Sequence, residues 1–432
     1  MAMKVHTMKL QNFRCFKDLE MTFDPRMTVI VGDNAAGKTA ILKGLTSGLG
    51  AYLSGIDSDA VKAPGIDIPD VRYETVSAGQ SLERQPQFPA SIQIQAEFEP
   101  GKSVCWTRLR KAEKGRTTRS DSKPAADIAH AYHQRIRKGD ETLTLPMIGF
   151  YGTERLWLQK KDGRKNQAYT RISGYIDCLD GKSNEKLMLK WFEQKSWKEF
   201  NTRQSNRQLD SVKQAVTEIF IQLTGADEAD LSYDPELAEL VLIYRNQTEG
   251  QISRNFSSLS DGYRELLSLA ADIAWRMAVL NPQLESPYKE TPGIIMIDEI
   301  ELHLHPKWQS IILNCLQAVF PKVQFVVTTH SPLVIQSIEE SRLRILREQD
   351  QIGLGESDNR GASLSSILNG IMGASDRPRD VEEMFRHLDN CIDQQDWSGA
   401  EECLHQLRRI VGDSDEEVLK QQTIVNFEKD QE

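Results

Sequence analysis

Long apolar runs are absent from this sequence, and cysteine is scarce. No stretch approaches the roughly 18 consecutive apolar residues that a membrane-spanning helix requires, and the first residues lack the apolar core of a secretory signal. The 6 cysteines among 432 residues are scattered, without a C-x-x-C pair. This usage excludes a disulfide-stabilised secreted fold and is typical of reduced, mostly buried thiols. We therefore expect a cytoplasmic protein that binds no membrane.

Positive charge is in deficit overall, because the formal net charge is −10, but it is unevenly distributed. Residues 102–138 carry eleven Lys and Arg against three acids, and residues 155–171 carry six against one. Residues 376–432 carry sixteen acids against seven Lys and Arg. Clustered cations suit a polyanion such as a nucleic acid, whereas the acidic segment suits a different partner. The length allows two or three domains.

The clearest motif is Gly32-x4-Gly37-Lys38-Thr39, which follows an apolar run and precedes a helix-forming stretch. This is the pattern of a P-loop, whose glycines let successive backbone N–H groups turn toward a phosphate at a helix N-terminus. The lysine then reaches the outer phosphates, and the threonine hydroxyl can bind Mg²⁺. A chance glycine turn is the alternative, which the later motifs disfavour. The predicted nucleotide-binding residues of this element are Gly32, Asn34, Ala35, Ala36, Gly37, Lys38, Thr39 and Ala40.

Two apolar strands further along the chain end in residues that suit the same chemistry. Residues 293–297 are followed by Asp298 and Glu299. Acids at the carboxyl end of such a strand hold Mg²⁺ and the attacking water in P-loop proteins, so we predict Asp298 as a Mg²⁺ ligand and Glu299 as a catalytic residue. Residues 323–327 form the second strand, and His330 follows it at the same expected sheet edge. We predict that His330 is the other catalytic residue and hydrogen-bonds a γ-phosphate.

Ser260, Asp261 and Gly262 open a helix that we predict to run through Leu280. They can be a plain helix cap, or the hydroxyl, the amide N–H and the helix N-terminus can bind a second phosphate. With a P-loop upstream, we favour the phosphate site. Arg14, between two N-terminal strands, is a further candidate because a guanidinium suits phosphate and stacks on a base; a surface arginine in a turn is an equal alternative.

The remaining pattern gives a coarse organisation. Alternating or apolar runs predict strands near residues 3–23, 91–98, 104–109, 145–151 and 239–244, and residues 50–90 and 111–123 are expected to be loops. We predict an ATPase head from residues 1–150 and 240–350. A mainly helical arm or lid at 151–239 is expected to stand off the sheet, and an acidic helical region at 351–432 is expected to dock a partner.

Together these motifs resemble the ATPase head of the ABC superfamily, in its soluble branch with Rad50, RecF and the structural-maintenance-of-chromosomes (SMC) proteins. The resemblance implies an α/β fold with an ABC-type P-loop ATPase head, ATP and Mg²⁺ as cofactors, and face-to-face pairing of two heads. Ser260, Asp261 and Gly262 would then complete the P-loop site of the other copy. The family usually has glycine where Asp261 stands, so slow hydrolysis is expected. The motifs that carry the resemblance are Asn12-Phe13-Arg14, the P-loop, Leu259-Ser260-Asp261-Gly262, Ile297-Asp298-Glu299 and Thr329-His330-Ser331-Pro332.

Residues 299–308 narrow the resemblance to ATPases of bacterial anti-phage systems, namely the overcoming-lysogeny-defect (OLD) nucleases, Gabija, and PtuA of Septu systems and related retrons. The OLD and Gabija types carry a nuclease domain with a late Asp-x-Asp. Asp413-Ser414-Asp415 matches those letters, but the residues before it have helical spacing. The resemblance to PtuA therefore implies an ATPase without nuclease activity of its own. It also implies a homodimer or higher homo-oligomer that controls a separate HNH nuclease, PtuB, which cleaves DNA.

Two other functions stay open, a RecF/SMC-like DNA-repair ATPase and an ATP-bound scaffold with little turnover. The basic segments are our hypothesis for DNA binding, and a solvated loop surface is the alternative. The residues assigned to DNA contact are Arg108, Arg110, Lys111, Lys114, Arg116, Arg119, Lys160, Lys161, Arg164 and Lys165.

Overall fold

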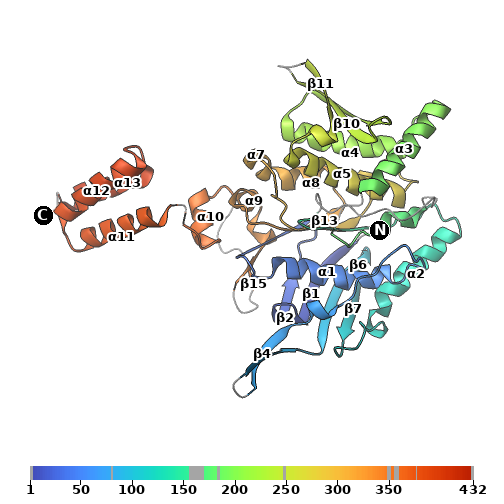
Figure 1. The fold of residues 1–432 in the computed structure, drawn as a ribbon, viewed down its shortest axis with the longest axis horizontal. Coiled ribbons are helices and arrows are strands. Elements are labelled where there is room, and N and C mark those ends of the chain that lie inside the picture. Colours follow the sequence, from blue (N-terminus) through green and yellow to red (C-terminus); the bar gives the residue numbers. More distant parts are fainter. Residues whose placement is uncertain are drawn as a thin grey trace. The chain divides into compact units, whose positions relative to one another are not determined.

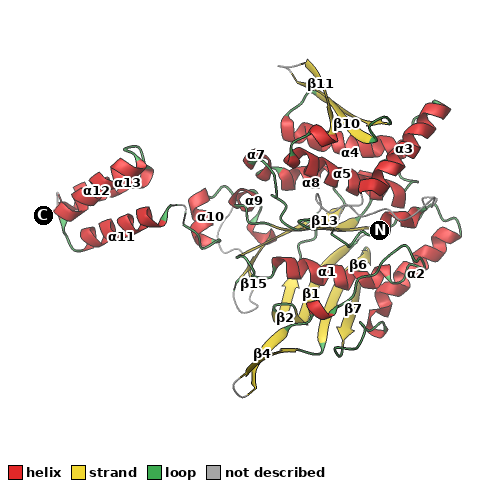
Figure 2. Cartoon of the chain, in the orientation of Figure 1, coloured by secondary structure: helices red, strands yellow, loops and turns green. Residues whose placement is uncertain are grey.

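The computed structural model of the chain describes residues 3–78, 81–154, 170–181, 185–246, 250–347, 352–354, 360–375 and 377–429. The chain divides into two compact units, Met1–Ala362 and Ser363–Glu432. The first unit contains all the sheets together with many helices, and the second is helical (Figures 1 and 2). All the motifs of the predicted ATP site lie in the first unit.

The central sheet of the first unit has the strand order β15-β14-β3-β13-β12-β8, with β15 antiparallel and the others parallel. β8, β12 and β13 are buried at every position, as expected for parallel strands that are covered on both faces. Because the carboxyl ends of parallel strands share one edge, β3, β12 and β13 deliver the segments that follow them to the same place. The strands are β3 (Met27–Gly32), β8 (Met147–Tyr151), β12 (Gly293–Ile297), β13 (Val323–Thr328), β14 (Leu343–Leu346) and β15 (Ile352–Leu354).

A second, antiparallel sheet has the order β2-β1-β6-β7 and packs on helix α1 (Lys38–Leu53), which also contacts the central sheet. Burial alternates along β6, so one face of this sheet is covered. The helix approaches closely at Gly48, where an added Cβ would lie 2.2 Å from Ile94 Cδ1. A glycine here therefore allows the sheet to pack directly on the P-loop helix. The strands are β1 (Lys4–Phe13), β2 (Phe16–Thr22), β6 (Ala90–Glu99) and β7 (Lys102–Arg110).

Two segments that we expected to be loops contain regular structure. β4 (Tyr73–Ala78) and β5 (Ser81–Pro86) form an antiparallel hairpin. Lys123, at the end of the second expected loop, begins helix α2 (Lys123–Arg137), which packs on α1. Among the described residues, the hairpin strands pair only with each other, so they lack the buried face that produces an apolar alternation in the sequence.

One helix of the expected arm or lid at 151–239 packs on the head. Helix α4 (Arg207–Thr224) buries its apolar face against α5 (Asp261–Leu280) and α8 (Ile312–Val319). Gln208 Nε2 on α4 donates a hydrogen bond to the carbonyl oxygen of Ala278 on α5, at 3.1 Å. A helix with an apolar stripe must bury it, and the head supplies the complementary surface.

The other elements of the first unit are short or lie outside the two main sheets. Strands β9, β10 and β11 form a small antiparallel sheet, and β9 packs on α4. These elements are α3 (Glu185–Thr202), α6 (Pro287–Glu290), α7 (Pro306–Gln309), α9 (Pro332–Gln336), β9 (Glu228–Asp234), β10 (Glu239–Asn246), β11 (Gly250–Asn255), and 3₁₀ turns at Ile68–Asp70, Ser120–Ser122, Arg171–Tyr175, Phe256–Ser258 and Glu340–Arg342.

In the described residues of the second unit there are four helices, α10 (Leu364–Gly370), α11 (Arg379–Asp393), α12 (Trp397–Val411) and α13 (Glu416–Lys429). The predicted C-terminal helical tail is therefore confirmed. None of the helices in the described part of the chain has the length and apolar composition needed to cross a bilayer. The apolar core of the unit consists of Val381, Phe385, Leu388, Cys391, Ala400, Leu404, Leu407, Val418 and Val425.

The Asp-x-Asp sequence in this unit connects α12 to α13. Asp415 Oδ1 accepts hydrogen bonds from the backbone N–H of Val418, at 3.1 Å, and from the guanidinium of Arg377, at 2.9 Å. The Asp415 carboxylate therefore holds the start of a helix and forms an ion pair.

Candidate nucleotide-binding site

The P-loop joins β3 to α1, as its sequence predicts. Gly37 has φ of 102°, and a Cβ added there would lie 2.6 Å from both Cys15 Sγ and Phe16 Cζ. Only glycine adopts this backbone without strain, and only a residue without a side chain fits beneath the β1–β2 turn. Lys38 begins the helix, and its Nζ donates hydrogen bonds to the carbonyl oxygens of Gly32, at 2.6 Å, and Asp33, at 2.9 Å.

Lys38 is nearly enclosed, with 6% of its surface exposed. Burial lowers the pKa of its ammonium from the ordinary value of 10.5, although the carboxylates of Asp298 and Glu299 act in the opposite direction. A desolvated ammonium has few competing water contacts. It is therefore suited to exchange its two carbonyl acceptors for phosphate oxygens.

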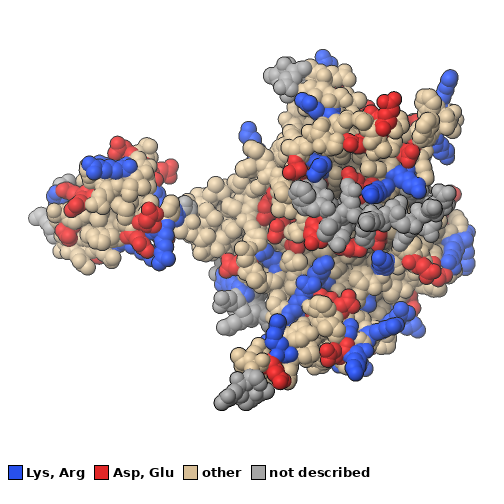
Figure 3. Space-filling model, viewed as in Figure 1, with Lys and Arg blue, Asp and Glu red and all other residues tan. Residues whose placement is uncertain are grey.

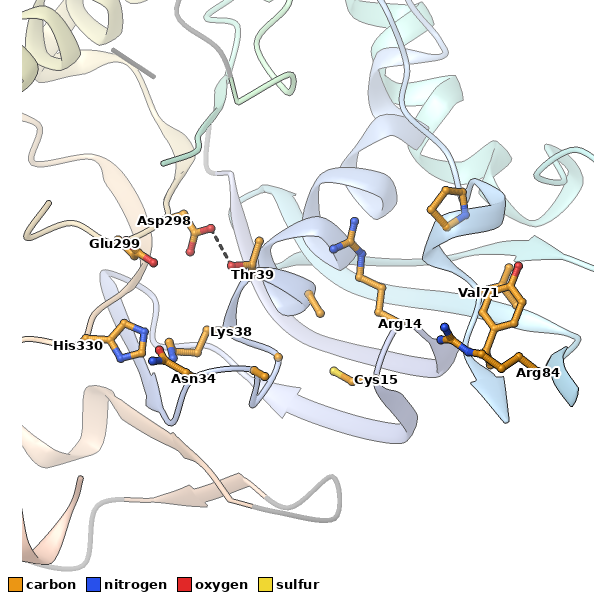
Figure 4. A pocket seen from close by; sticks show the side chains of 15 residues that line it. Arg14, Cys15, Asn34, Lys38, Thr39, Val71, Arg84, Asp298, Glu299 and His330 are labelled. Carbon is orange, nitrogen blue, oxygen red and sulfur yellow. Dashed lines mark hydrogen bonds between the residues drawn. The ribbon is translucent and has the colours of Figure 1, made fainter. Parts of the chain in front are cut away.

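Asp298 connects the P-loop helix to the central sheet. Its Oδ2 accepts a hydrogen bond from Thr39 Oγ1 at 2.8 Å (Figure 4). Its Oδ1 accepts one from Thr328 Oγ1 at 2.6 Å. The carboxylate is 4% exposed. Carboxylate and hydroxyl oxygens are the ligands that Mg²⁺ takes beside phosphate in P-loop sites, so the donor set present here fits that ion.

Glu299 follows directly and has φ of 49°, a left-handed conformation that is strained for a glutamate. Its backbone N–H donates to Thr328 Oγ1 at 2.8 Å, so one hydroxyl fixes both Asp298 and Glu299. His330 comes from the end of β13, and its backbone N–H donates to the Glu301 carboxylate. The structure thus brings both predicted catalytic side chains to the P-loop.

These groups line one cavity of about 630 Å³. Figure 4 shows Asp298, Glu299, His330 and Lys38 at one end and Arg84 at the other. Arg14 lies between them with φ of 53°, and its guanidinium pairs with Asp70 at 2.8 Å. The lining residues are Arg14, Cys15, Asn34, Ala35, Gly37, Lys38, Thr39, Ala40, Pro69, Val71, Tyr73, Arg84, Asp298, Glu299 and His330.

Sequence reasoning missed the wall of this cavity that the β4–β5 hairpin supplies. Tyr73 and Arg84 come from its two strands, and the Arg84 guanidinium lies 5.4 Å from the centre of the Tyr73 ring. The signal available was an alternation on either side of Gly79, which is weak because both strand faces are polar. The hairpin therefore adds an aromatic and cationic surface that no sequence motif predicts.

The predicted second phosphate element lies in a separate cavity of about 570 Å³, which we call the Ser260 cavity. Ser260 precedes α5 and, with Asp261, is exposed. Gly262 is closely packed, since an added Cβ would lie 2.4 Å from the His303 carbonyl oxygen. One chain therefore does not bring this element to Lys38. The cavity is lined by Ser260, Asp261, Gly262, Tyr263, His303, Leu304, His305 and Trp308.

Two of the predicted DNA contacts are incorrect, because Arg108 and Arg110 on β7 are buried, at 6% and 9% exposure. Arg110 donates to the carbonyl oxygens of Ile66, at 2.9 Å, and Glu113, at 2.7 Å, and so holds loops in place. Burial, with a smaller contribution from Arg119, lowers the pKa of Arg108 to about 10. β7 alternates between exposed and enclosed positions, and both arginines fall on its enclosed side.

The other predicted DNA contacts divide into two groups. Lys111, Lys114, Arg116 and Arg119 are exposed in the segment between β7 and α2. Lys and Arg side chains, interspersed with acids, occur on the side of the first unit where β7 and α2 lie (Figure 3). Lys160, Lys161, Arg164 and Lys165 lie outside the described residues.

Two sequence families match the chain. The AAA domain family matches residues 7–224, which is half of the chain, and the AAA ATPase domain family matches residues 153–335. The fold and the site define a P-loop ATPase with an ABC-type head, as predicted, and the chain belongs to the AAA domain family. The chain is also similar to Septu PtuA proteins and to retron ATPases, which confirms the predicted resemblance.

Curated relatives cover most of the chain. The Retron Vc95 probable ATPase of Vibrio cholerae serotype O1 biovar El Tor is 25% identical over 459 residues, covering 93% of this chain and 85% of the relative. The Septu protein PtuA of Bacillus thuringiensis is 23% identical and covers 93% of each chain. Among solved structures, an Smc head domain with an extended coiled coil from Pyrococcus furiosus has a TM-score of 0.46 at 14% identity, covering 83% of this chain and 95% of that chain.

Proposed function

We propose that this chain is the ATP-binding and ATP-hydrolysing subunit of a bacterial anti-phage defence complex. In this proposal it pairs through its heads and controls a separate HNH nuclease that cleaves DNA. The ATPase part rests on the single cavity in which the P-loop, Asp298, Glu299 and His330 meet. The similarity to a Septu PtuA and to retron ATPases supports the defence part.

Phosphate binding would use groups that are already in place. The triphosphate would accept hydrogen bonds from the P-loop N–H groups at the start of α1. Lys38 would exchange the carbonyl oxygens of Gly32 and Asp33 for phosphate oxygens. Mg²⁺, when held by Thr39 and Asp298, would neutralise charge on the outer phosphates.

The nucleoside would extend toward Arg14 and the β4–β5 hairpin, at the other end of the same cavity. An aromatic ring and a guanidinium both offer flat surfaces on which a base can stack. The Tyr73–Arg84 pair therefore supplies the base-binding surface in this proposal.

Hydrolysis would depend on Glu299 and His330. Glu299 would orient the attacking water and accept its proton, while His330 would donate a hydrogen bond to the γ-phosphate. Glu299→Gln keeps the shape but removes the base, so we expect turnover to fall by about 100-fold or more while ATP still binds. The exposed Glu228→Gln on β9 is the matched control and should keep wild-type turnover. Equal turnover in both variants would contradict the assignment.

The second copy would supply the Ser260 element. A serine hydroxyl and the N-terminus of the 20-residue helix α5 are exposed together, as a phosphate carried by another chain requires. We expect Glu299→Gln chains to pair when ATP is added and to stay paired, because hydrolysis no longer separates them. Size measurement by light scattering, with and without ATP, tests this, and a size unchanged by ATP would count against pairing.

Control of the nuclease would use the second unit, and DNA would contact the exposed basic segment. Truncation after residue 362 removes only the second unit, and we expect it to abolish co-purification with the HNH nuclease. For DNA, replacing Lys111, Lys114, Arg116 and Arg119 with alanine should weaken binding and reduce its salt dependence, since each lost phosphate contact lowers the slope by about one. Unchanged nuclease capture or an unchanged slope would contradict the respective part.

A further inference from the structure

Helices α11 and α12 of the second unit bring together three metal-ligating side chains that the proposed ATPase function does not use. His387 and Cys391 lie one turn apart on α11, and Cys403 faces them from α12. His387 Nδ1 lies 3.1 Å from Cys403 Sγ and 3.5 Å from Cys391 Sγ. All three ligand atoms lie within 4.8 Å of one another.

We propose that His387, Cys391 and Cys403 form a Zn²⁺ site that ties α11 to α12. Zinc–sulfur bonds of about 2.3 Å and zinc–nitrogen bonds of about 2.0–2.1 Å, at a tetrahedral angle, separate the nitrogen and sulfur ligands by roughly 3.6 Å. The two nitrogen–sulfur distances in the structure are 3.5 and 3.1 Å. The two helices therefore hold each sulfur within about half an ångström of its required distance from the His387 nitrogen.

The chemistry of the donors selects zinc over the magnesium of the ATP site. Thiolate and imidazole ligands suit Zn²⁺, whereas Mg²⁺ takes oxygen ligands. His387 is exposed and Cys403 is half-buried, so an ion can enter from solvent, and water can take the fourth position. The protein surroundings alone do not favour a thiolate, because burial and the nearby Cys391, Glu402 and Asp396 raise the pKa of Cys403. A bound cation would offset this repulsion.

The size of the second unit gives such a site a structural role. The unit spans only Ser363–Glu432, and single cores below roughly 70–80 residues supply little stability without a metal or another cross-link. Cys391 belongs to the apolar core, and Cys403 packs against it. A zinc ion would therefore fasten the two helices at the edge of this small core.

Zinc content of the full-length chain tests the proposal. Protein purified under reducing conditions is loaded with zinc chloride, desalted and measured by elemental analysis, and its affinity is measured by competition with a chromogenic chelator. We expect one zinc per chain in the wild type and a loss of affinity of more than about tenfold in Cys403→Ser and in His387→Ala. Cobalt should give a thiolate-to-metal charge-transfer band that both variants lose. Cys105→Ser and His405→Ala, which change an exposed cysteine and an exposed histidine outside the cluster, are the controls.

A second measurement uses only the wild-type protein, so a variant that fails to fold leaves the proposal testable. Zinc should slow alkylation of Cys391 and Cys403 by more than about tenfold, whereas the alkylation rate of Cys105 should not change. The proposal is wrong if the wild type retains no zinc, if the variants retain as much as the controls, or if Cys391 and Cys403 form a disulfide in the zinc-loaded protein. None of these measurements involves ATP, so their outcome is independent of the proposed ATPase function.

Discussion

The P-loop cavity and the Ser260 cavity lie on the same head but are assembled differently. In the first, Lys38 and Asp298 are buried, at 6% and 4% exposure, and each already makes hydrogen bonds within the chain. In the second, Ser260 and Asp261 face solvent at the start of a long helix. In the proposed function, one chain supplies the catalytic residues, and its exposed Ser260 element serves the site of another copy. This difference is what would allow ATP to couple binding to assembly.

The largest effect is expected when the P-loop cavity is disabled. Lys38→Ala removes the only ammonium that the structure places among the lining residues of this cavity. We expect ATP affinity and turnover each to fall by about 100-fold or more, because the phosphate charge loses its buried counter-charge. Isothermal titration calorimetry and phosphate release measure these two losses. Lys322→Ala, at the opposite end of β13, is the matched control; a Lys38→Ala chain that binds ATP like this control would refute the site.

Disabling the Ser260 cavity should leave the ATP affinity of a single chain unchanged. Ser260→Arg places a bulky side chain where the second phosphate element is proposed, so pairing and turnover should be lost while a single chain still binds ATP. Ser257→Arg, an exposed neighbour outside the cavity, should resemble the wild type.

Mixing the two disabled chains makes the test sharper. Neither variant is expected to pair with itself, because Lys38→Ala chains bind ATP poorly and Ser260→Arg chains carry the blocking side chain. A mixed pair holds one disabled site and one site with an intact Lys38 and an intact Ser260, so turnover should recover to at most about half of the wild-type value. No recovery, with both variants folded, would mean that the two cavities do not meet across copies.

The P-loop cavity was easier to predict from the sequence than the Ser260 cavity. Its phosphate end consists of contiguous residues after buried strands, and both the P-loop and Asp298-Glu299 follow apolar runs that can be read directly. Its other wall could not be read, because Tyr73 and Arg84 reach the cavity only through a polar hairpin.

The main errors in the predictions from sequence concern charged residues that the structure buries. We predicted from the sequence that Arg108 and Arg110 contact DNA. Both side chains lie on the buried face of β7 instead. Similarly, the helical pattern expected within residues 151–239 did not show the surface that α5 offers to α4. The cluster of His387, Cys391 and Cys403 has no C-x-x-C spacing because two helices share it. Pairing between elements, which periodicity does not encode, accounts for all of these.

A smaller effect on ATP affinity should distinguish the base-binding end of the P-loop cavity from its phosphate-binding end. Tyr73→Ala removes the proposed base-stacking surface but leaves the phosphate groups in place, so ATP affinity should fall by about 5- to 100-fold, with the affinity for inorganic triphosphate unchanged. Tyr263→Ala, in the Ser260 cavity, is the control for loss of a tyrosine and should keep the affinity of a single chain for ATP. An equal loss of affinity for ATP and triphosphate would show that Tyr73 acts only on the fold.

The smallest expected effect is a pH dependence of ATP affinity, which arises from Lys38 in the P-loop cavity. Burial lowers the pKa of Lys38 below 10.5, so in the window between the lowered value and 10.5 the unfolded chain binds more protons than the folded one. In that window the contribution of Lys38 to the free energy of unfolding rises with pH, since a buried charge is removed. ATP affinity should change in the opposite direction, because phosphate requires the ammonium, and it should be constant below the lowered pKa. Fluorescent-nucleotide titrations at increasing pH measure this decline; in Lys38→Arg, whose guanidinium keeps its charge, the decline should be absent. A wild-type affinity that stays constant up to pH 10.5 would mean that Lys38 is no more enclosed than the solvent-facing groups of the Ser260 cavity.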